Sequence, residues 1–260
     1  MPNDLHGKAS QFLNLHRQAK ALLMPNAWDA GSAKLLAGLG YTALATSSGA
    51  AAAVMGRKDG QLTRDEALAH AKAIAQATDL PVSADLENGF GAEPAAAALT
   101  IRLAAEAGIV GGSIEDAVPD AKPYDLTHAA ERVAAAAQAA QALRLPFTLT
   151  ARAENYLRGN PDLDDTIRRL QAYEKAGADV LFAPGLPDLA AVRAVCAALT
   201  KPLSFMVGIP GKSFSVAELE AAGVKRISFA TSFYRAAMRA ALVAATEVKE
   251  HGTFNYLKAP

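Results

Sequence analysis

Residues 81–116 read PVSADLENGFGAEPAAAALTIRLAAEAGIVGGSIED. Two short runs, 81–86 and 111–116, show no alternation of apolar and polar side chains, and an alanine-rich helical stretch at 94–107 separates them. Short apolar runs separated by helices are typical of a parallel sheet that is covered on both faces. This stretch therefore predicts a strand–helix–strand unit whose two strands both end in acidic residues.

The same alternation extends over the rest of the chain. Further short runs lie at 21–26, 42–47, 146–152, 178–184, 201–207 and 225–231. Further helical stretches lie at 63–78, 127–144, 163–176, 187–199 and 232–249. The first of these opens with TRDE, which predicts a capping box with Thr63 as the N-cap and Glu66 as its partner.

About eight strands, each followed by a helix, fit an α/β fold in one of two arrangements. These are an open doubly wound sheet and a closed barrel. Eight units in 260 residues match the usual size of the (β/α)8 barrel, so we expect that fold. No linker rich in Pro, Gly or Ser divides the chain, which predicts a single domain over 1–260 with a helical extension at about 1–20 that closes the bottom of the barrel.

Composition and charge exclude several classes of protein. The chain has 26 Lys plus Arg and 26 Asp plus Glu, so it lacks the basic footprint of a nucleic-acid-binding protein. No apolar stretch is long enough to cross a membrane, and the polar N-terminus does not resemble a secretory signal. The single cysteine, Cys196, forms no internal disulfide, and a reduced, cytoplasmic setting is expected.

Acidic side chains follow two neighbouring strands, at the end where barrel enzymes place their active sites. Asp85 and Glu87 are two residues apart and share one face of an extended strand, and Glu115 ends the next strand. Clustered carboxylates repel one another unless a cation is present, and such oxygen ligands suit Mg²⁺ or Mn²⁺. The three acids predict a metal site, although each alone would equally fit a helix cap or a salt bridge.

Other polar residues at the strand ends predict contacts with an anion. Arg152 offers a planar guanidinium that suits a carboxylate or a phosphate. The backbone N–H groups of Ser48, Gly49 and Ala50 can cradle an anionic oxygen, although a tight turn explains these small residues equally well. Trp28 follows the first strand, where it would either line a pocket or pack at the rim.

A polar segment with two prolines, DAVPDAKPYD, runs from Asp116 to Asp125. It follows a candidate metal ligand directly, so it stands where a lid would close over a substrate and exclude water. Lys122 is the only cation in the segment. An ordinary surface loop with a solvated lysine would explain the same residues.

Two sequences that resemble nucleotide-binding motifs fail on spacing. GIPGKS at 208–213 lacks the glycine of a phosphate-binding loop, because Met206 occupies its place. Gly89-Phe90-Gly91 lacks the third glycine of a dinucleotide fingerprint. A nucleotide-dependent oxidoreductase is therefore the weakest interpretation. None of the five histidines falls at a predicted strand end, which disfavours zinc and a histidine base.

Several motifs together resemble the isocitrate lyase/phosphoenolpyruvate mutase superfamily. In order, from about residue 20 to residue 240, they are MPNAWDAGSAKLLAGLGYTALATSSGA, GRKDGQLTRDE, ADLENGFG, SIEDAV, LTARAEN and GVKRISFATSFYRAAM. The pair DLENGFG and SIED is more specific than any single motif. The resemblance implies a (β/α)8 barrel that exchanges its C-terminal helix with a neighbouring subunit, a homodimer or homotetramer, and a Mg²⁺-dependent site for 2-oxo or 2-hydroxy carboxylates.

The resemblance also implies roles for individual residues. Asp85 matches the direct metal ligand, Glu87 and Glu115 match acids that hold the metal mainly through its waters, and Asp59 of GRKDG matches an acid that reaches the same waters. Lys122 aligns loosely with a lysine of the lid. The residues expected to be catalytic are Asp59, Glu115, Lys122 and Arg152. Those expected to contact the substrate are Trp28, Ser48, Gly49, Ala50, Asp85, Arg152 and Ser204.

Departures from the family pattern reduce the number of activities that the resemblance supports. The isocitrate and methylisocitrate lyases carry a lid with a Lys-Lys/Arg-Cys-Gly-His motif, whereas the segment here contains no cysteine. The phosphonopyruvate-forming mutases have an asparagine beside the lid lysine, and 117–126 contains none. Ser204 stands where the family often has asparagine.

The resemblance and its departures predict a lyase that works through a metal-stabilised pyruvate enolate. The expected substrate is a small 2-oxo or 2-hydroxy diacid such as oxaloacetate, cleaved at a carbon–carbon bond with Mg²⁺ or Mn²⁺ as cofactor. Two alternatives stay open. One is a phosphorus–carbon mutase or hydrolase, and the other is a non-catalytic barrel that binds a 2-oxo acid.

Overall fold

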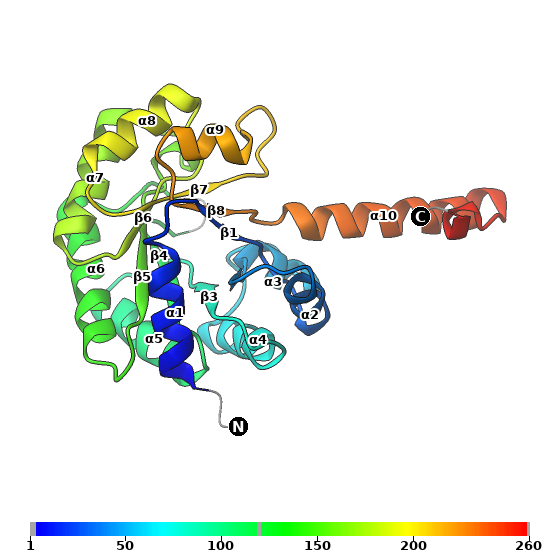
Figure 1. The fold of residues 1–260 in the computed structure, drawn as a ribbon, viewed down its shortest axis with the longest axis horizontal. Coiled ribbons are helices and arrows are strands. Elements are labelled where there is room, and N and C mark those ends of the chain that lie inside the picture. The colour runs from blue at the N-terminus through cyan, green and yellow to red at the C-terminus, as the bar shows by residue number, and fades with distance from the viewer. Residues whose placement is uncertain (1–3, 119–120, 259–260) are drawn as a thin grey trace.

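A closed ring of eight parallel strands forms the centre of the molecule (Figure 1). The computed structural model describes residues 4–118 and 121–258. The strands are β1 (Leu22–Met24), β2 (Leu44–Ala45), β3 (Val82–Asp85), β4 (Gly111–Glu115), β5 (Thr148–Arg152), β6 (Val180–Phe182), β7 (Leu203–Met206) and β8 (Arg226–Ser228). Hydrogen bonds join them in the order β1-β8-β7-β6-β5-β4-β3-β2, and a bridge between Asn26 and Ala45 closes the ring. The expected (β/α)8 barrel is confirmed.

Helices surround the ring and connect its strands. They are α1 (Leu5–Leu15), α2 (Ala30–Gly38), α3 (Ser48–Val54), α4 (Arg64–Gln76), α5 (Pro94–Glu106), α6 (Leu126–Gln141), α7 (Leu163–Lys175), α8 (Leu189–Ala198), α9 (Val216–Ala221) and α10 (Ser232–His251). The predicted capping box of Thr63 and Glu66 begins α4. The glycines Gly177 and Gly223 follow α7 and α9 with positive φ, because each helix must turn sharply into the next strand.

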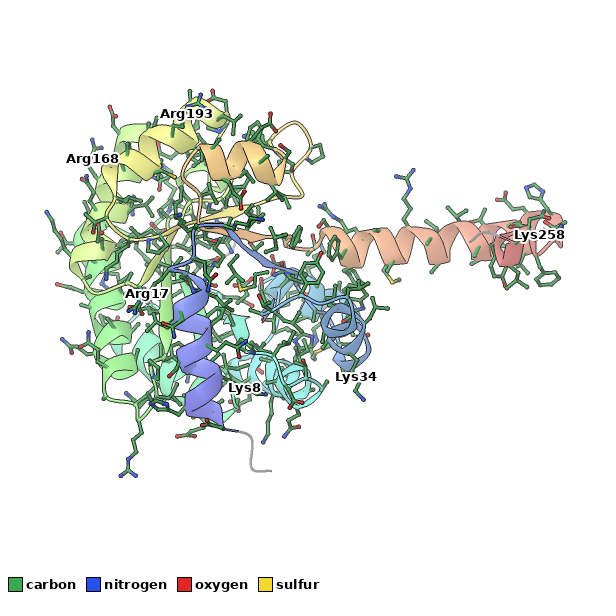
Figure 2. The ribbon with its side chains drawn as sticks, in the orientation of Figure 1. Lys8, Arg17, Lys34, Arg168, Arg193 and Lys258 are labelled. Carbon is green, nitrogen blue, oxygen red and sulfur yellow. The ribbon has the colours of Figure 1, made fainter. Side chains whose placement is uncertain are left out.

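Small side chains let the helices approach the ring closely. Ala97 and Ala104 on α5 and Ala136 on α6 are fully buried. Charged side chains such as Lys34, Arg168 and Arg193 point away from the barrel (Figure 2). Within residues 4–118 and 121–258, no helix combines the length and apolar character needed to cross a membrane.

Helix α1 closes the end of the barrel where the strands begin. Its Phe12 is fully buried and belongs to a small apolar cluster with Leu22, Met24 and Val110. This is the helix expected within the first twenty residues. The opposite end, where the strands finish, stays open to the loops, so α1 leaves that end free for a site.

His16, directly after α1, is buried beneath the barrel without a full set of hydrogen bonds. Its Nδ1 lies 2.8 Å from the carbonyl oxygen of Phe12, whereas its Nε2 is buried and has no partner among the described residues. Burial, with a smaller contribution from the charge on Arg226, lowers the pKa of His16 to about 3. The folded protein therefore holds this imidazole neutral.

Replacing His16 with glutamine should make the protein less sensitive to acid. The unfolded chain protonates His16 below a pH of about 6.5 and the folded chain does not, so its contribution to stability is complete above that pH and is lost as the pH falls toward 3. The wild type should lose about 2 kcal/mol more than His16→Gln between pH 7 and pH 5. Urea unfolding across this range measures the difference, and parallel curves for the two proteins would contradict it.

Helix α10 extends away from the barrel (Figure 1). None of its 20 residues is buried. Its large apolar side chains are exposed, with Met238 at 51%, Leu242 at 66% and Val243 at 60%. Near its start, the ring of Tyr234 packs edge-on against Trp28, with 6.0 Å between centroids. Exchange of this helix between subunits, and the homodimer or homotetramer that it implies, stay predictions.

Candidate active site

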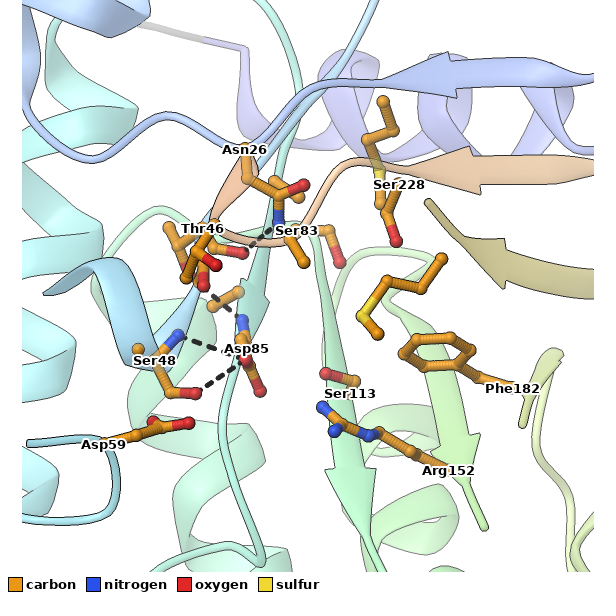
Figure 3. A pocket seen from close by; sticks show the side chains of 18 of the residues that line it. Asn26, Thr46, Ser48, Asp59, Ser83, Asp85, Ser113, Arg152, Phe182 and Ser228 are labelled. Carbon is orange, nitrogen blue, oxygen red and sulfur yellow. Dashed lines mark hydrogen bonds between the residues drawn. The ribbon is translucent and has the colours of Figure 1, made fainter. Parts of the chain in front are cut away.

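A cavity of about 210 Å³ lies inside the carboxyl end of the barrel. Asp59, Asp85 and Ser48 lie on one side of it, and Arg152 and Phe182 lie on the other (Figure 3). The strands contribute small hydroxyl side chains, Ser83, Ser113 and Ser228, which leave room in the interior. The cavity therefore places carboxylates opposite a guanidinium group.

Asp85 ends β3 and is held by the first residue of α3. Its Oδ2 accepts hydrogen bonds from the backbone N–H of Ser48 at 3.0 Å and from the Ser48 hydroxyl at 2.9 Å (Figure 3). The Asp85 N–H donates to the hydroxyl of Thr46 at 3.0 Å. The Ser48 amide that was expected to receive an anionic ligand is thus used here to orient a carboxylate, and the Ala50 amide donates to Ser47, the N-cap of α3.

Asp59 approaches the same cluster from the loop after α3. A Cβ added to Gly49 would lie 3.4 Å from Asp59 Oδ2 and 3.3 Å from Thr231 Cγ2, so a side chain here would press on the Thr231 methyl group. Burial, together with the negative charge of Asp85, raises the pKa of Asp59. The shift in pKa shows that the carboxylates of Asp59 and Asp85 lie close enough to repel each other.

Glu87 adds a third carboxylate to the cluster. Its backbone has a positive φ of 48°, which an L-residue adopts at a cost, and its side chain is 6% exposed. Burial and the charges of Asp85 and Asp59 raise the pKa of Glu87 to about 7, and its Oε1 is buried without a hydrogen-bond partner among the described residues.

These acids suit a divalent cation that is held partly through water. Repelling carboxylates with an unpartnered oxygen form an environment that a cation would stabilise, and oxygen donors are those that Mg²⁺ prefers. No group of three His, Cys, Asp or Glu side chains within residues 4–118 and 121–258 is arranged to hold a metal by itself. Direct coordination by one acid, with the others bound through metal waters, fits both observations.

Arg152, at the end of β5, is enclosed by carboxylates. Its Nη1 lies 3.3 Å from Glu115 Oε2, and its Nε donates to Glu154. Its guanidinium carbon lies 5.2 Å from the centre of the Phe182 ring. Burial opposes the charged form, but Glu154 and Glu115 outweigh burial and raise the pKa of Arg152 above its ordinary value. Arg152 therefore presents a fixed positive charge to the cavity.

A second arginine, Arg158, forms ion pairs with the same two carboxylates. Its Nε lies 3.3 Å from Glu154 Oε2, and its Nη2 lies 3.7 Å from Glu115 Oε1. Glu154 is fully buried, and its backbone N–H donates to Asp116 at 2.8 Å. Burial dominates at Glu115 and raises its pKa well above the ordinary value, although Arg152 opposes this. The four residues form one buried ion-pair network.

The expected site residues divide into two groups. Ser48, Gly49, Asp59, Asp85 and Arg152 line the cavity. The remainder lie outside its lining, namely Trp28, Ala50, Glu87, Glu115, Lys122 and Ser204. Lys122 is exposed, in a lid segment whose residues 119–120 lie outside the described part of the chain. Ser204 is buried, and its hydroxyl accepts from Arg226.

Sequence reasoning missed three residues that shape the site. Glu154 and Arg158 complete the network around Arg152, and only their position just after a strand could have suggested it. Arg226 begins β8 and lines the cavity from below. A charged residue at the start of a strand ordinarily indicates the protein surface, so no signal in the sequence pointed to Arg226.

Comparison with known proteins gives a consistent group of relatives. The family model described as phosphoenolpyruvate phosphomutase matches residues 12–249. A crystal structure from Burkholderia cenocepacia J2315, provisionally described as a lyase/mutase, is 51% identical, with a TM-score of 0.96 over 98% of this chain and 92% of that one. An uncharacterized protein of Mycobacterium tuberculosis H37Rv is 34% identical over 92% of this chain and 89% of its own length. The 2-methylisocitrate lyase of Bacillus subtilis 168 is 30% identical over 94% of this chain and 83% of its own length.

Proposed function

Because the chain belongs to the phosphoenolpyruvate mutase/isocitrate lyase superfamily, we propose that it is a Mg²⁺-dependent carbon–carbon lyase or decarboxylase of a small 2-oxo or 2-hydroxy diacid such as oxaloacetate. One observation carries the proposal. The cavity sets the carboxylates Asp59 and Asp85 opposite the guanidinium of Arg152, within a volume of about 210 Å³. Such an arrangement suits a small acid bridged between a cation and an arginine.

Asp85 would hold the metal ion directly, and Glu87 and Glu115 would hold it through water. When bound, Mg²⁺ would withdraw negative charge from the oxygens of a 2-oxo acid, and Mn²⁺ would serve in the same way. The two hydrogen bonds from Ser48 keep the Asp85 carboxylate in one orientation, so little rearrangement is needed for binding.

Arg152 supplies the fixed positive charge. Its guanidinium stabilises the oxygen that becomes negative as a carbon–carbon bond breaks, and the ion pairs with Glu115 and Glu154 prevent it from moving. In oxaloacetate the bond between C3 and C4 would break, CO₂ would leave, and the electron pair would remain as pyruvate enolate. A proton from water would then reach C3 and give pyruvate.

The cysteine chemistry of the methylisocitrate lyases does not fit this chain. The segment from Asp116 to Asp125 contains no cysteine. The only cysteine, Cys196, lies on α8, and burial raises the pKa of its thiol to about 11. A thiol in that place is inert and remote from the strand ends, so a different diacid is the expected substrate.

Phosphorus–carbon chemistry is the second candidate. The observation that favours it is the match to the phosphoenolpyruvate phosphomutase family model over residues 12–249. The same cavity would take phosphonopyruvate in place of oxaloacetate, since Arg152 suits a phosphonate as well as a carboxylate. Phosphorus NMR of the protein with phosphonopyruvate separates the two, because only this candidate changes the phosphorus signal.

We expect the protein to convert oxaloacetate to pyruvate at a rate that depends on Mg²⁺. Free metal ions decarboxylate oxaloacetate slowly, so the reference is the same reaction without protein. Pyruvate formation is followed with Mg²⁺ and with a chelator. Turnover equal to the reference would reject oxaloacetate as the substrate, and an unchanged phosphonopyruvate signal would reject the second candidate. Another small diacid, or a barrel that only binds a 2-oxo acid, would then remain.

A further inference from the structure

Arg226 is a buried cation without an acidic partner. It begins β8, is 3% exposed, and donates from Nε to Ser204 and from Nη1 to Thr150, both at 2.9 Å. In the described part of the chain no carboxylate forms an ion pair with it, and its Nη2 makes no hydrogen bond. Burial alone lowers its pKa to about 9, so it remains charged at neutral pH.

An unpaired buried charge is costly and needs an explanation. Arg152 pairs with Glu115 and Glu154, and Arg169 pairs with Asp116. The buried Arg132 has no ion pair among the described residues, but its guanidinium donates to the backbone oxygens of Asn88, Gly91 and Ala92. Arg226 differs because it lines the cavity of the candidate active site and, unlike Arg152, has no carboxylate partner among the described residues. The group that balances its charge would therefore enter through that cavity.

Strand geometry places Arg226 one layer below Arg152. Thr150, which accepts from Arg226, precedes Arg152 by two residues on β5, and alternate residues of a strand share a face. Two residues of strand span about 6.6 Å. A four-carbon diacid can cover this distance if the guanidinium groups of Arg152 and Arg226 each reach toward one of its carboxylates. The serine hydroxyls of Ser83, Ser113 and Ser228 line the same cavity and can donate to carboxylate oxygens.

We propose that Arg226 binds the second carboxylate of a dicarboxylate substrate from the floor of the cavity, and that it selects diacids over monoacids. The proposal rests on the proposed function, in which the first carboxylate lies at the rim between the acid cluster and Arg152. A monoacid would leave Arg226 without a counter-charge. A diacid supplies that charge, and the serines supply hydrogen bonds to the same carboxylate.

The test compares the binding of malate and lactate, which differ by one carboxylate, in the presence of Mg²⁺. Isothermal titration of the wild type should give malate an affinity about tenfold or more above that of lactate, because charged hydrogen bonds of this kind contribute at least that much. In Arg226→Met, which keeps the volume and removes the charge, the two affinities should be equal. A preference for malate that survives in Arg226→Met, or that is absent from the wild type, would overturn the proposal.

Stability distinguishes ligand binding from a purely structural role. The unliganded Arg226→Met protein should melt no lower than the wild type, because the substitution removes an unpaired buried charge. Arg132→Met is the matched control, since Arg132 is equally buried but donates to the backbone oxygens of Asn88, Gly91 and Ala92, and its loss should lower the melting temperature. Melting of Arg226→Met well below the wild type would mean that Arg226 holds the barrel together, and would count against the proposal.

Two further substitutions of Arg226 test the same preference for malate. Arg226→Lys keeps the charge but loses the planar fork, so it should retain part of the preference for malate. Loss of the whole preference in a folded Arg226→Gln would support the proposal equally, and its retention would overturn it. Binding is measured without turnover, so failure of the oxaloacetate assay and failure of this selectivity test are separate results.

Discussion

Asp85→Asn should reduce turnover of oxaloacetate by about 10³-fold and remove its dependence on Mg²⁺. The substitution keeps the size of the side chain, and its remaining oxygen can still accept the two hydrogen bonds from Ser48. What it removes is the negative charge that would hold the cation. Titration with Mg²⁺ followed by calorimetry, together with pyruvate formation, measures both losses.

The fold should survive this substitution, because the charge of Asp85 raises the pKa of Glu87 and Asp59 and removing it relieves that repulsion. Asp164→Ala is the matched control, since Asp164 is an exposed acid in the first turn of α7. It should leave Mg²⁺ binding and turnover unchanged. Mg²⁺-dependent turnover of Asp85→Asn at the wild-type rate would place the metal site elsewhere.

Arg152→Met should lower both activity and stability. Its guanidinium is the positive charge opposite the acid cluster, and loss of one such group lowers kcat/KM by about 10²- to 10³-fold. The substitution also leaves Glu115 and Glu154 buried with only Arg158 as partner, a change that costs about 3–5 kcal/mol in comparable networks. Steady-state kinetics and urea unfolding measure the two effects.

A second substitution separates these effects. Glu154→Gln in the Arg152→Met background removes the stranded charge, so stability should return in part while kcat/KM stays low. Arg158→Met is the matched control, because Arg158 pairs with the same carboxylates but does not line the cavity. It should lose stability with a smaller loss of kcat/KM. Equal losses of activity in Arg152→Met and Arg158→Met would mean that Arg152 acts only through the network.

The barrel was predictable because its signals are local and repeated. Buried parallel strands appear as short apolar runs, and capping residues such as Thr63 and glycines such as Gly177 mark where helices begin and end. The short helix α3 was not predictable, because its residues, SGAAAAV, fit a small-residue turn equally well. Its first amide bonds to Asp85 in the fold, a contact between segments 37 residues apart.

The residues of the candidate site that lie at the end of a strand could be predicted from the sequence, and those that lie at the start of a strand could not. Asp85 and Arg152 end β3 and β5, so locating the strand ends in the sequence predicts that both residues lie at the same end of the barrel. Arg226 begins β8, and its side chain enters the interior because the facing residues Ser204 and Thr150 are small and polar. That arrangement depends on three strands at once, which no local pattern in the sequence records.

The projecting helix α10 offers a direct readout of assembly. Most of the stability of a helix in a protein comes from packing against other elements, and α10 buries none of its residues within its own chain. Its backbone amides would therefore exchange hydrogen with solvent at a rate close to that of an isolated peptide unless another molecule covers the apolar side chains of Met238, Leu242 and Val243. Deuterium uptake over residues 232–251, followed as the protein is diluted, would thus test whether copies of the chain associate through this helix.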